Sequence, residues 1–282
     1  MAGQATRTPG RRRTIILAVC CCAVMVILAI AIPLAVVSAG HAGSLKTTVI
    51  NRCQTFLKTH STVSSDIKCD DIWDAFQNAF VGKDQCNVPV EAYDDLVNMV
   101  KQKSSCNNML FWSKTKDIVH ELTHATKCFI TLEDTFLGFL MDNLTWCSKK
   151  DSTKIFDTYK DCPQSCRPNA VSAFWIRASA NFAQSSCGNV TAMLNGSLPT
   201  PFSNSSIFGS VEVQNLNPLK VGTVNVVLIV QENDRTTCQN DSLQDLKKIL
   251  VPGLRYSCKE VPISKIHQCI QAPTITCGKC WE

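Results

Sequence analysis

The run His-Glu-Leu-Thr-His at positions 120–124 has the residue types of a zinc-protease helix. Histidines four residues apart share one helical face and can ligate zinc, with Glu121 as the general base. The extended protease pattern fails, because Lys127 and Ile130 stand where it has glycine and histidine. A surface helix that carries two histidines is therefore favoured, and a membrane-anchored zinc metalloprotease is kept as the alternative.

Four other residues could do chemistry but also have ordinary structural interpretations. Trp175 and Ser179 lie one helical turn apart, so they project from the same face of a helix predicted over residues 169–183. Glu133 falls in the first turn of another predicted helix, where a carboxylate stabilises the helix dipole. Glu212, in Ser-Val-Glu-Val, would be the solvent-facing residue of a strand. Residue type and spacing alone favour these structural roles.

Several common motifs are absent from the sequence. No G-x-G-x-x-G follows a predicted strand, and there is no Walker loop and no G-x-S-x-G elbow. Cys162–Cys166 and Cys277–Cys280 are spaced like metal or redox pairs. In a cysteine-dense secreted chain, however, disulfides are the better interpretation.

The N-terminus predicts a membrane anchor. Residues 14–39 form an almost uninterrupted apolar run without a charge, preceded by four arginines. About 20 apolar residues cross a bilayer, and a positive flank stays in the cytoplasm. We therefore expect a cytoplasmic tail over 1–13, one transmembrane signal anchor over 14–39 and an extracellular domain over 40–282, giving a single-pass type II plasma-membrane protein. A cleaved signal peptide is the alternative, since Val37-Ser38-Ala39 resembles a cleavage site.

Charge and cysteine content agree with an extracellular domain. The net charge of +5 comes mainly from the N-terminal arginines, which leave 24 basic and 23 acidic residues after position 40, so no nucleic-acid partner is expected. Fourteen of the 17 cysteines follow position 40 and indicate an oxidising compartment. Glycans are expected at four N-x-S/T sequons (Asn189, Asn195, Asn204 and Asn240), with the strongest expectation for Asn195 and Asn204. A fifth, at Asn143, is expected to be unmodified or only partly modified. A homodimer is compatible with the sequence.

Periodicity predicts a helical first half and an α/β second half. Helices are expected over residues 70–81, 90–100, 131–144 and 169–183. Residues 224–230 form a β-branched run typical of a strand buried on both faces, followed by a predicted helix over 242–251 and a strand over 254–261. This order indicates a right-handed crossover in a parallel sheet. Residues 210–213 are expected to end or follow another strand.

These elements predict a two-lobed α+β or α/β domain. A helical lobe over about 45–105 and 131–186 would pack on a small parallel-sheet lobe over about 106–130 and 187–282.

Six runs resemble the ADP-ribosyl cyclase and cyclic ADP-ribose hydrolase family, in matching order and spacing from Cys53 to Cys277. They are WDAFQNAF at 73–80, LFWSKTKD at 110–117, TLEDTFLGFLMDNLTWC at 131–147, VSAFWIRASANFA at 171–183, MLNGS at 193–197 and FGSVEVQNL at 208–216. The family's glycolipid-anchored members carry a C-terminal hydrophobic tail, whereas this chain ends ITCGKCWE.

The resemblance implies five catalytic residues. Glu212 matches the essential carboxylate, and Glu133 matches the residue that balances cyclisation against hydrolysis. Trp112 and Trp175 match the aromatic walls of the pocket, and Ser179 matches a contact to the reacting ribose.

Five further residues are implied in substrate binding. Asp142 matches the acid that faces the nicotinamide amide. Ser113, Lys114 and Phe208 match positions near the phosphates, and Leu132 is placed in the same substrate site.

The implied activity is cleavage of the nicotinamide–ribose bond of NAD by an ectoenzyme, which gives ADP-ribose and cyclic ADP-ribose and also hydrolyses the cyclic product. Both are small-molecule substrates that feed calcium-mobilising messengers; no cofactor and no metal are expected. A carboxylate can stabilise the oxocarbenium-like centre electrostatically or as a nucleophile, and both possibilities stay open for Glu212. A non-catalytic cell-surface receptor is a further alternative.

The resemblance also implies a set of disulfides, and the sequence departs from the family pattern at three positions. The implied pairs are Cys53–Cys69, Cys86–Cys166, Cys106–Cys187, Cys147–Cys162, Cys238–Cys258 and Cys269–Cys277, which leave Cys128 and Cys280 over. Ile207 stands where the family often has a hydroxyl, Lys114 where it often has arginine, and Asn143 creates a sequon beside the pocket.

Overall fold

The computed structural model describes residues 44–60, 66–100, 106–272 and 280–281. The predicted tail and anchor, residues 1–39, lie outside these ranges. Within the ranges described, no helix is long and apolar enough to cross a membrane.

A four-stranded parallel sheet forms the second half of the domain, in the order β1-β4-β5-β6. The strands are β1 (Leu110–Ser113), β4 (Gly188–Asn195), β5 (Val221–Val230) and β6 (Arg255–Pro262). Each pairs in parallel with its neighbour, and α9 (Asp241–Ile249) crosses between β5 and β6. The predicted strand–helix–strand unit and the parallel sheet are therefore confirmed.

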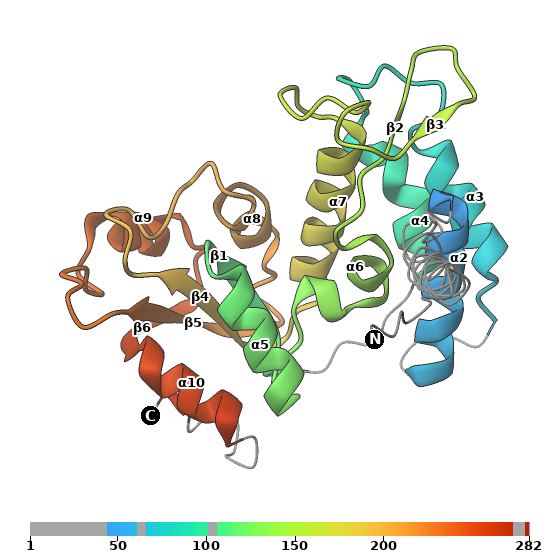
Figure 1. Cartoon of the computed structure of the whole chain (residues 1–282). Helices are drawn as coiled ribbons and strands as arrows, with labels where there is room; N and C mark the ends of the chain where they lie inside the picture. Colours follow the sequence, from blue (N-terminus) through green and yellow to red (C-terminus); the bar gives the residue numbers. More distant parts are fainter. Residues whose placement is uncertain (1–43, 61–65, 101–105, 273–279, 282) are drawn as a thin grey trace, which may run out of the picture. The chain divides into compact units, whose positions relative to one another are not determined.

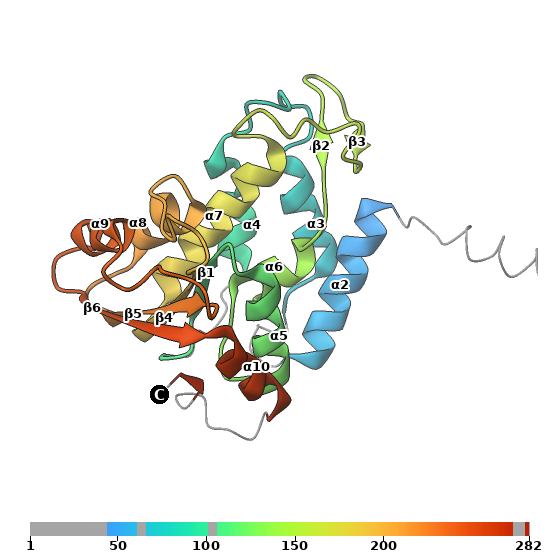
Figure 2. The ribbon, with the colours of Figure 1, turned by 60° about the vertical axis from the view of Figure 1, so that its left-hand side comes forward.

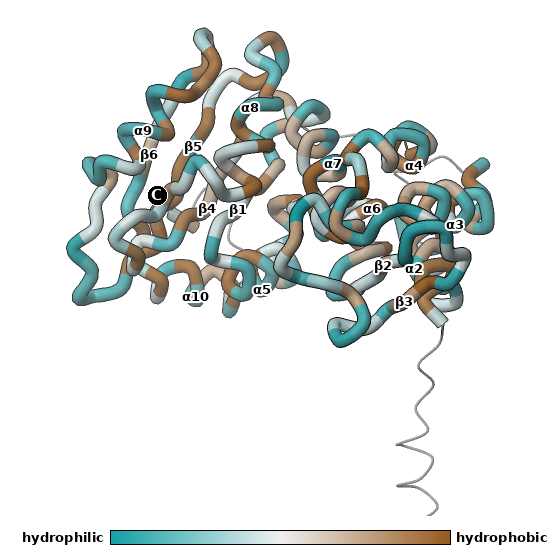
Figure 3. The backbone as a smooth tube through the Cα atoms, turned by 90° about the horizontal axis from the view of Figure 1, so that it is seen from above, coloured by the Kyte–Doolittle hydropathy of each residue, from teal (hydrophilic) through white to brown (hydrophobic). Residues whose placement is uncertain are grey.

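Helices cover both faces of this sheet, with α9 on one side and α5 (Lys116–Thr126) and α10 (Ile263–Gln271) on the other (Figures 1 and 2). Val226 and Leu228 of β5 pack into the larger core together with Leu246 of α9. Val227 and Ile229 pack into a smaller core with α5 and α10. Burial on both faces explains why the strand reads as a continuous apolar run, which Figure 3 shows along β5.

The first half is mainly helical. It contains α2 (Leu45–Thr59), α3 (Cys69–Asn78), the 3-10 helix η1 (Val90–Tyr93), α4 (Asp94–Met99), the 3-10 helix η2 (Leu132–Asp134), α6 (Phe136–Met141) and α7 (Ala170–Ser185). A two-stranded antiparallel ribbon pairs β2 (Cys147–Ser148) with β3 (Ile155–Phe156).

Buried aromatic residues fix where α7 begins. The Nε1 of Trp146 donates to the hydroxyl of Tyr93 at 2.9 Å, and that hydroxyl donates to the carbonyl of Ala170 at 2.9 Å. Asn169 caps the helix by accepting from the backbone N–H of Ser172 at 2.9 Å. These hydrogen bonds fix the first turn of α7, the helix that carries Trp175 and Ser179.

The structure corrects two expectations about local elements. Residues 208–212 form a π-helix, η3 (Phe208–Glu212), followed by α8 (Val213–Asn215), and not a strand end. The reason is tertiary: Phe208 is buried against Phe111 and Phe202, a contact that strand periodicity does not report. The helix expected over 131–144 is divided in two: a capping box of Thr131 and Asp134 opens the short helix η2, and α6 starts separately after it.

Five of the six implied disulfides are confirmed: Cys53–Cys69, Cys86–Cys166, Cys106–Cys187, Cys147–Cys162 and Cys238–Cys258. The sixth is corrected, because Cys269 pairs with Cys280 and not with Cys277. Cys280 is buried, and the next residue, Trp281, stacks on Phe129 at 5.2 Å, which seats the C-terminus beside α10. Cys128 is also disulfide-bonded. Both cysteines that were expected to be left over, Cys128 and Cys280, are therefore paired.

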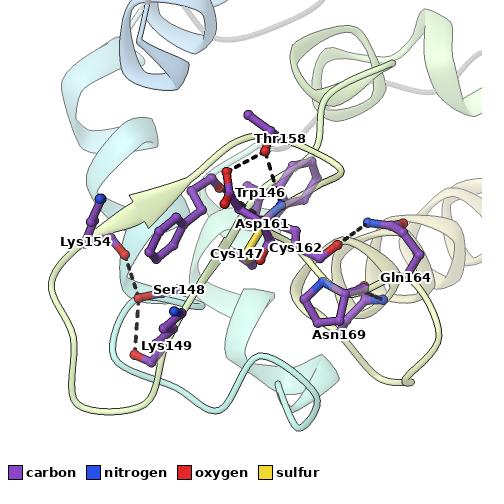
Figure 4. The surroundings of a disulfide bond; sticks show 12 residues. Trp146, Cys147, Ser148, Lys149, Lys154, Thr158, Asp161, Cys162, Gln164 and Asn169 are labelled. Carbon is purple, nitrogen blue, oxygen red and sulfur yellow. Dashed lines mark hydrogen bonds between the residues drawn. A yellow bond between two sulfur atoms is a disulfide. The ribbon is translucent and has the colours of Figure 1, made fainter.

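Figure 4 shows the Cys147–Cys162 disulfide, which cross-links the segment that contains β2 and β3. Ser148 Oγ donates to the carbonyl of Lys154 at 2.9 Å, and Gln164 Nε2 donates to the carbonyl of Cys162 at 3.1 Å. This cross-linked loop, residues 147–168, carries side chains that reach the functional site.

Candidate active site

A cavity of about 660 Å³ lies where the carboxyl end of β1 meets α7, η2 and η3. In parallel α/β sheets, ligands bind beyond the carboxyl ends of the strands. The volume is in the range of small-molecule sites. All ten residues implied in catalysis and substrate binding line it: Trp112, Ser113, Lys114, Leu132, Glu133, Asp142, Trp175, Ser179, Phe208 and Glu212. Positions 100 residues apart in sequence therefore meet in one cavity.

Glu212 is the most deeply buried carboxyl of the cavity, with an exposed fraction of 8%. It ends the π-helix η3, an irregularity that often marks functional sites. Gly209 allows this turn, because a Cβ there would come within 2.4 Å of the carbonyl oxygen of Ser203. The hydroxyl of Ser179, on α7, hydrogen-bonds to the Glu212 side chain.

Burial raises the pKa of Glu212 to about 8. The Ser179 hydrogen bond opposes this effect, and the charge of Glu133 adds to it. At neutral pH this environment therefore favours a protonated Glu212. An entering cation would favour the ionised form instead.

The pKa of Glu133 is shifted in the opposite direction. Burial by itself raises its pKa, but the interactions with His120, its own backbone and Trp112 outweigh burial and hold the pKa below the ordinary value. The Nε1 of Trp112 donates to its Oε2 at 3.2 Å. Two carboxyls whose environments push their pKa values apart are a common basis for divided roles in catalysis.

The His120 imidazole lies behind Glu133. Its Nε2 is 3.6 Å from Oε2 of Glu133, which is too long for a hydrogen bond and is best described as a charge contact. Attraction to Glu133 raises the pKa of His120, although burial opposes the rise.

Asp142 closes the same side of the cavity, just after α6. The Nζ of Lys116 donates to its Oδ1 at 3.2 Å, and Nδ2 of Asn143 donates to its Oδ2 at 2.9 Å. The guanidinium of Arg52 donates to the carbonyl of Asp142 at 2.8 Å and to that of Leu140 at 3.0 Å, which fixes the end of α6.

Trp112 and Trp175 supply aromatic surface from two elements. Trp112 is on β1 and Trp175 on α7, and both are half-buried at the cavity wall. Phe174 contacts the Trp175 ring edge-on at 5.2 Å between centroids. Such faces bind flat and cationic rings.

The lining also includes residues that were not predicted as part of the site, among them the polar and charged side chains of Lys116, Tyr159, Gln164 and Arg167. Lys116 follows the predicted Lys114 closely, so its place in the LFWSKTKD run was an available signal. The other three belong to the cross-linked loop 147–168, which has no periodicity to place it. Tyr159, with an exposed fraction of 70%, stands at the rim.

The His-Glu-x-x-His motif is not arranged as a metal site. His120 faces Glu133, while Glu121 and His124 are exposed on α5. Among the residues that the structure describes, no group of three His, Cys, Asp or Glu side chains could hold a metal ion.

The sequons differ in exposure. Asn143, Asn189 and Asn204 are exposed, and Asn195 and Asn240 are half-buried. The Nδ2 of Asn195 donates to the carbonyl of Lys114 at 3.2 Å, and that of Asn240 to Pro199 at 3.0 Å.

An α+β domain whose cavity holds one carboxyl with a raised pKa and one with a lowered pKa, between aromatic walls, has the features of an enzyme for a cationic aromatic substrate. The family model described as ADP-ribosyl cyclase matches residues 42–278, and the chain belongs to this family.

Relatives and solved structures agree with this assignment. The chain is 36% identical over 260 residues to ADP-ribosyl cyclase/cyclic ADP-ribose hydrolase 1 of Oryctolagus cuniculus, covering 88% of this chain and 87% of the relative. It is 31% identical to the ADP-ribosyl cyclase/cyclic ADP-ribose hydrolase of Aplysia kurodai, covering 78% and 80%. Porcine CD38 complexed with a covalent intermediate superimposes with a TM-score of 0.72 at 36% identity, covering 79% of this chain and 98% of that one. An ADP ribosyl cyclase complexed with N1-cIDPR gives 0.73 at 27% identity, covering 83% and 96%.

Proposed function

We propose that this chain cleaves the nicotinamide–ribose bond of NAD, releases ADP-ribose and cyclic ADP-ribose, and hydrolyses the cyclic product. The observation that carries the proposal is one cavity that holds Glu212, Glu133 and two tryptophans. The names of the relatives, which combine cyclase and hydrolase, support both activities.

In the first step the C1′–N bond of NAD breaks and its electron pair leaves with nicotinamide. The ring carries a positive charge before cleavage and departs neutral, so no acid is needed to expel it. The charge passes to an oxocarbenium-like ribosyl centre, which Glu212 stabilises once it is ionised. The cationic ring bound between Trp112 and Trp175 favours that ionisation, because an opposite charge nearby lowers a carboxyl pKa.

Glu212 acts on the ribosyl centre as an ion-pair partner or through a C1′–O bond. The covalent intermediate described for porcine CD38 favours the second form for this chain. Ser179, which hydrogen-bonds to Glu212, is placed to orient this carboxylate toward the ribose.

The ribosyl centre is then divided between two nucleophiles. Water forms a C1′–O bond, loses a proton to the surrounding water and gives ADP-ribose, while adenine N1 forms a C1′–N bond and gives cyclic ADP-ribose. In the covalent form the C1′–O bond to Glu212 breaks as either new bond forms, and its electron pair returns to the Glu212 carboxylate. Glu133 orders the water, and Lys114 and Ser113 are placed at the mouth for the phosphates.

We also infer that residues 14–39 anchor the chain in the plasma membrane with the catalytic domain outside. The apolar run and its arginines support this topology, as do the disulfides of the described domain.

The direct experiment is incubation of the purified protein with NAD, with chromatographic measurement of nicotinamide and both nucleotide products. We expect nicotinamide equal to the sum of ADP-ribose and cyclic ADP-ribose, and conversion of added cyclic ADP-ribose to ADP-ribose. Neither reaction should respond to a chelator, whereas a zinc protease would lose peptide cleavage. Absence of nicotinamide release from folded protein would refute the proposal.

A further inference from the structure

Helix α5 presents two basic side chains to the two acids on one side of the cavity. Lys116 reaches Asp142 at 3.2 Å, and His120, one turn later on the same face, reaches Glu133 at 3.6 Å. The next residue on this face, His124, is exposed. The helix therefore places two basic side chains, four residues apart, next to the two acids of the cavity.

His120 is a polar, titratable side chain in a largely buried position. Its side chain has an exposed fraction of 21%, and that of Glu133 has 12%. Among the described residues, Nε2 of His120 has no hydrogen-bond partner and is buried. A buried donor without a partner is destabilising, so the nearby carboxylate is the group that compensates it.

The indole of Trp112 completes this arrangement. Its Nε1 donates to the same Oε2 atom that faces His120, and its ring meets the imidazole at 90° with 6.1 Å between centroids. Oε2 of Glu133 is thus held from two sides.

We propose that His120 is a positioning residue: its imidazolium holds the Glu133 carboxylate in place, and its protonation thereby sets how the reaction divides between water and adenine. This inference rests on the proposed function. It needs no contact between His120 and substrate, because the histidine acts through Glu133.

The surrounding charges fix the direction of the effect. The groups that act on His120 are Glu133 and Asp142, which favour the imidazolium, and Lys116, which opposes it. Glu212 is the other titratable group that interacts with Glu133. As pH rises and His120 loses its proton, Glu133 loses the imidazolium, keeps the interactions with Trp112 and its own backbone, and orders water less well. The fraction of cyclic ADP-ribose should therefore rise with pH.

The test compares wild type with His120→Gln, which is neutral at every pH, and with His124→Gln as the matched control on an exposed turn of the same helix. The ratio of cyclic ADP-ribose to ADP-ribose is measured from pH 5 to 9, with nicotinamide release recorded separately. We expect His120→Gln to raise the ratio about three- to tenfold at pH 6 and to flatten its pH dependence. His124→Gln should behave as wild type. An unchanged ratio and pH profile in His120→Gln would overturn the proposal.

A second measurement does not depend on turnover or on the folding of His120→Gln. Ring resonances of labelled histidines are titrated by NMR in wild type and in Glu133→Gln. We expect the midpoint of His120 to fall in Glu133→Gln, because the variant lacks the negative charge that raises the His120 pKa. An unmoved His120 midpoint would contradict the pairing. If wild type releases no nicotinamide, the proposed function fails, whereas this titration still decides whether the pair exists.

Discussion

The indole Nε1 of Trp112 donates to Oε2 of Glu133 across 3.2 Å and so joins an aromatic wall of the cavity to its ionised carboxylate. The two residues come from β1 and η2, which an isolated parallel bridge between Met109 and Ile130 brings together. The backbone N–H of Leu110 also donates to the carbonyl of Ile130 at 2.9 Å. The segment that carries Glu133 is therefore held in place by hydrogen bonds to the edge of the sheet.

Replacing Glu133 with leucine should shift the product ratio toward cyclic ADP-ribose while NAD turnover survives. Leucine removes the acceptor that orders water, and adenine attack needs no activated water. A change of about 1.4 kcal/mol in relative barrier gives a tenfold change in ratio. Chromatography of both products measures it, with Glu121→Leu, at an exposed position of α5, as the matched control. An unchanged ratio would leave Glu133 with a structural role only.

Replacing Trp175 with alanine should weaken substrate binding. The indole face offers a cation–π contact worth about 0.5–2 kcal/mol, so the KM for NAD should rise by roughly 2- to 30-fold. Trp175→Phe keeps an aromatic face and should recover most of the loss. Initial rates against NAD concentration test this, and an equal KM for wild type and alanine variant would argue against a stacked nicotinamide.

The pH profile of nicotinamide release should report the Glu212 proton. Since burial raises the pKa of Glu212 to about 8, the free enzyme must lose this proton before the carboxylate can stabilise positive charge. We expect kcat/KM to rise with pH and to level off above about 8. A flat profile from pH 5 to 8 would show that this proton does not limit the reaction.

Asn143 should carry little or no glycan in active protein. Its φ of 57° places it in the turn after α6, where its amide binds Asp142 at 2.9 Å and a glycan would crowd the cavity mouth. Exposed Asn204 is expected to be fully occupied. Glycopeptide mass spectrometry distinguishes the two sites, and full occupancy of Asn143 in active enzyme would contradict the geometry.

Local pattern was sufficient to predict the elements that support the cavity. The β-branched run at 224–230 predicted β5, and the turn between Trp175 and Ser179 placed both on one face of α7. Burial on two faces and helical spacing depend on residues that are close together in the sequence, so a single sequence is sufficient to predict them.

Contacts between distant residues could not be predicted in this way. Ser-Val-Glu-Val around Glu212 alternates like a strand, but packing of Phe208 on Phe111 makes it a π-helix. Cys277 and Cys280 are three residues apart, so spacing alone could not decide which of them pairs with Cys269. The zinc motif drew attention to His120, whose actual neighbour, Glu133, is outside the motif.

Glu212→Gln removes the buried carboxyl and keeps its shape, so the variant should fold. In wild type the raised pKa of Glu212 stabilises the fold below the ordinary value of 4.5 and the stabilisation is lost as pH rises to about 8. The loss is about 1.4 kcal/mol for each pH unit in that window. Thermal unfolding of Glu212→Gln should therefore show a weaker decline of Tm with pH than wild type.

The most direct test of the account is nicotinamide release by Glu212→Gln, measured beside wild type with secretion and Tm recorded for both. Without a carboxylate at this position the positive ribosyl centre is not stabilised, so release should fall by at least about a thousandfold in protein that is folded and secreted. Near-normal release by the folded variant would contradict the central role assigned to Glu212.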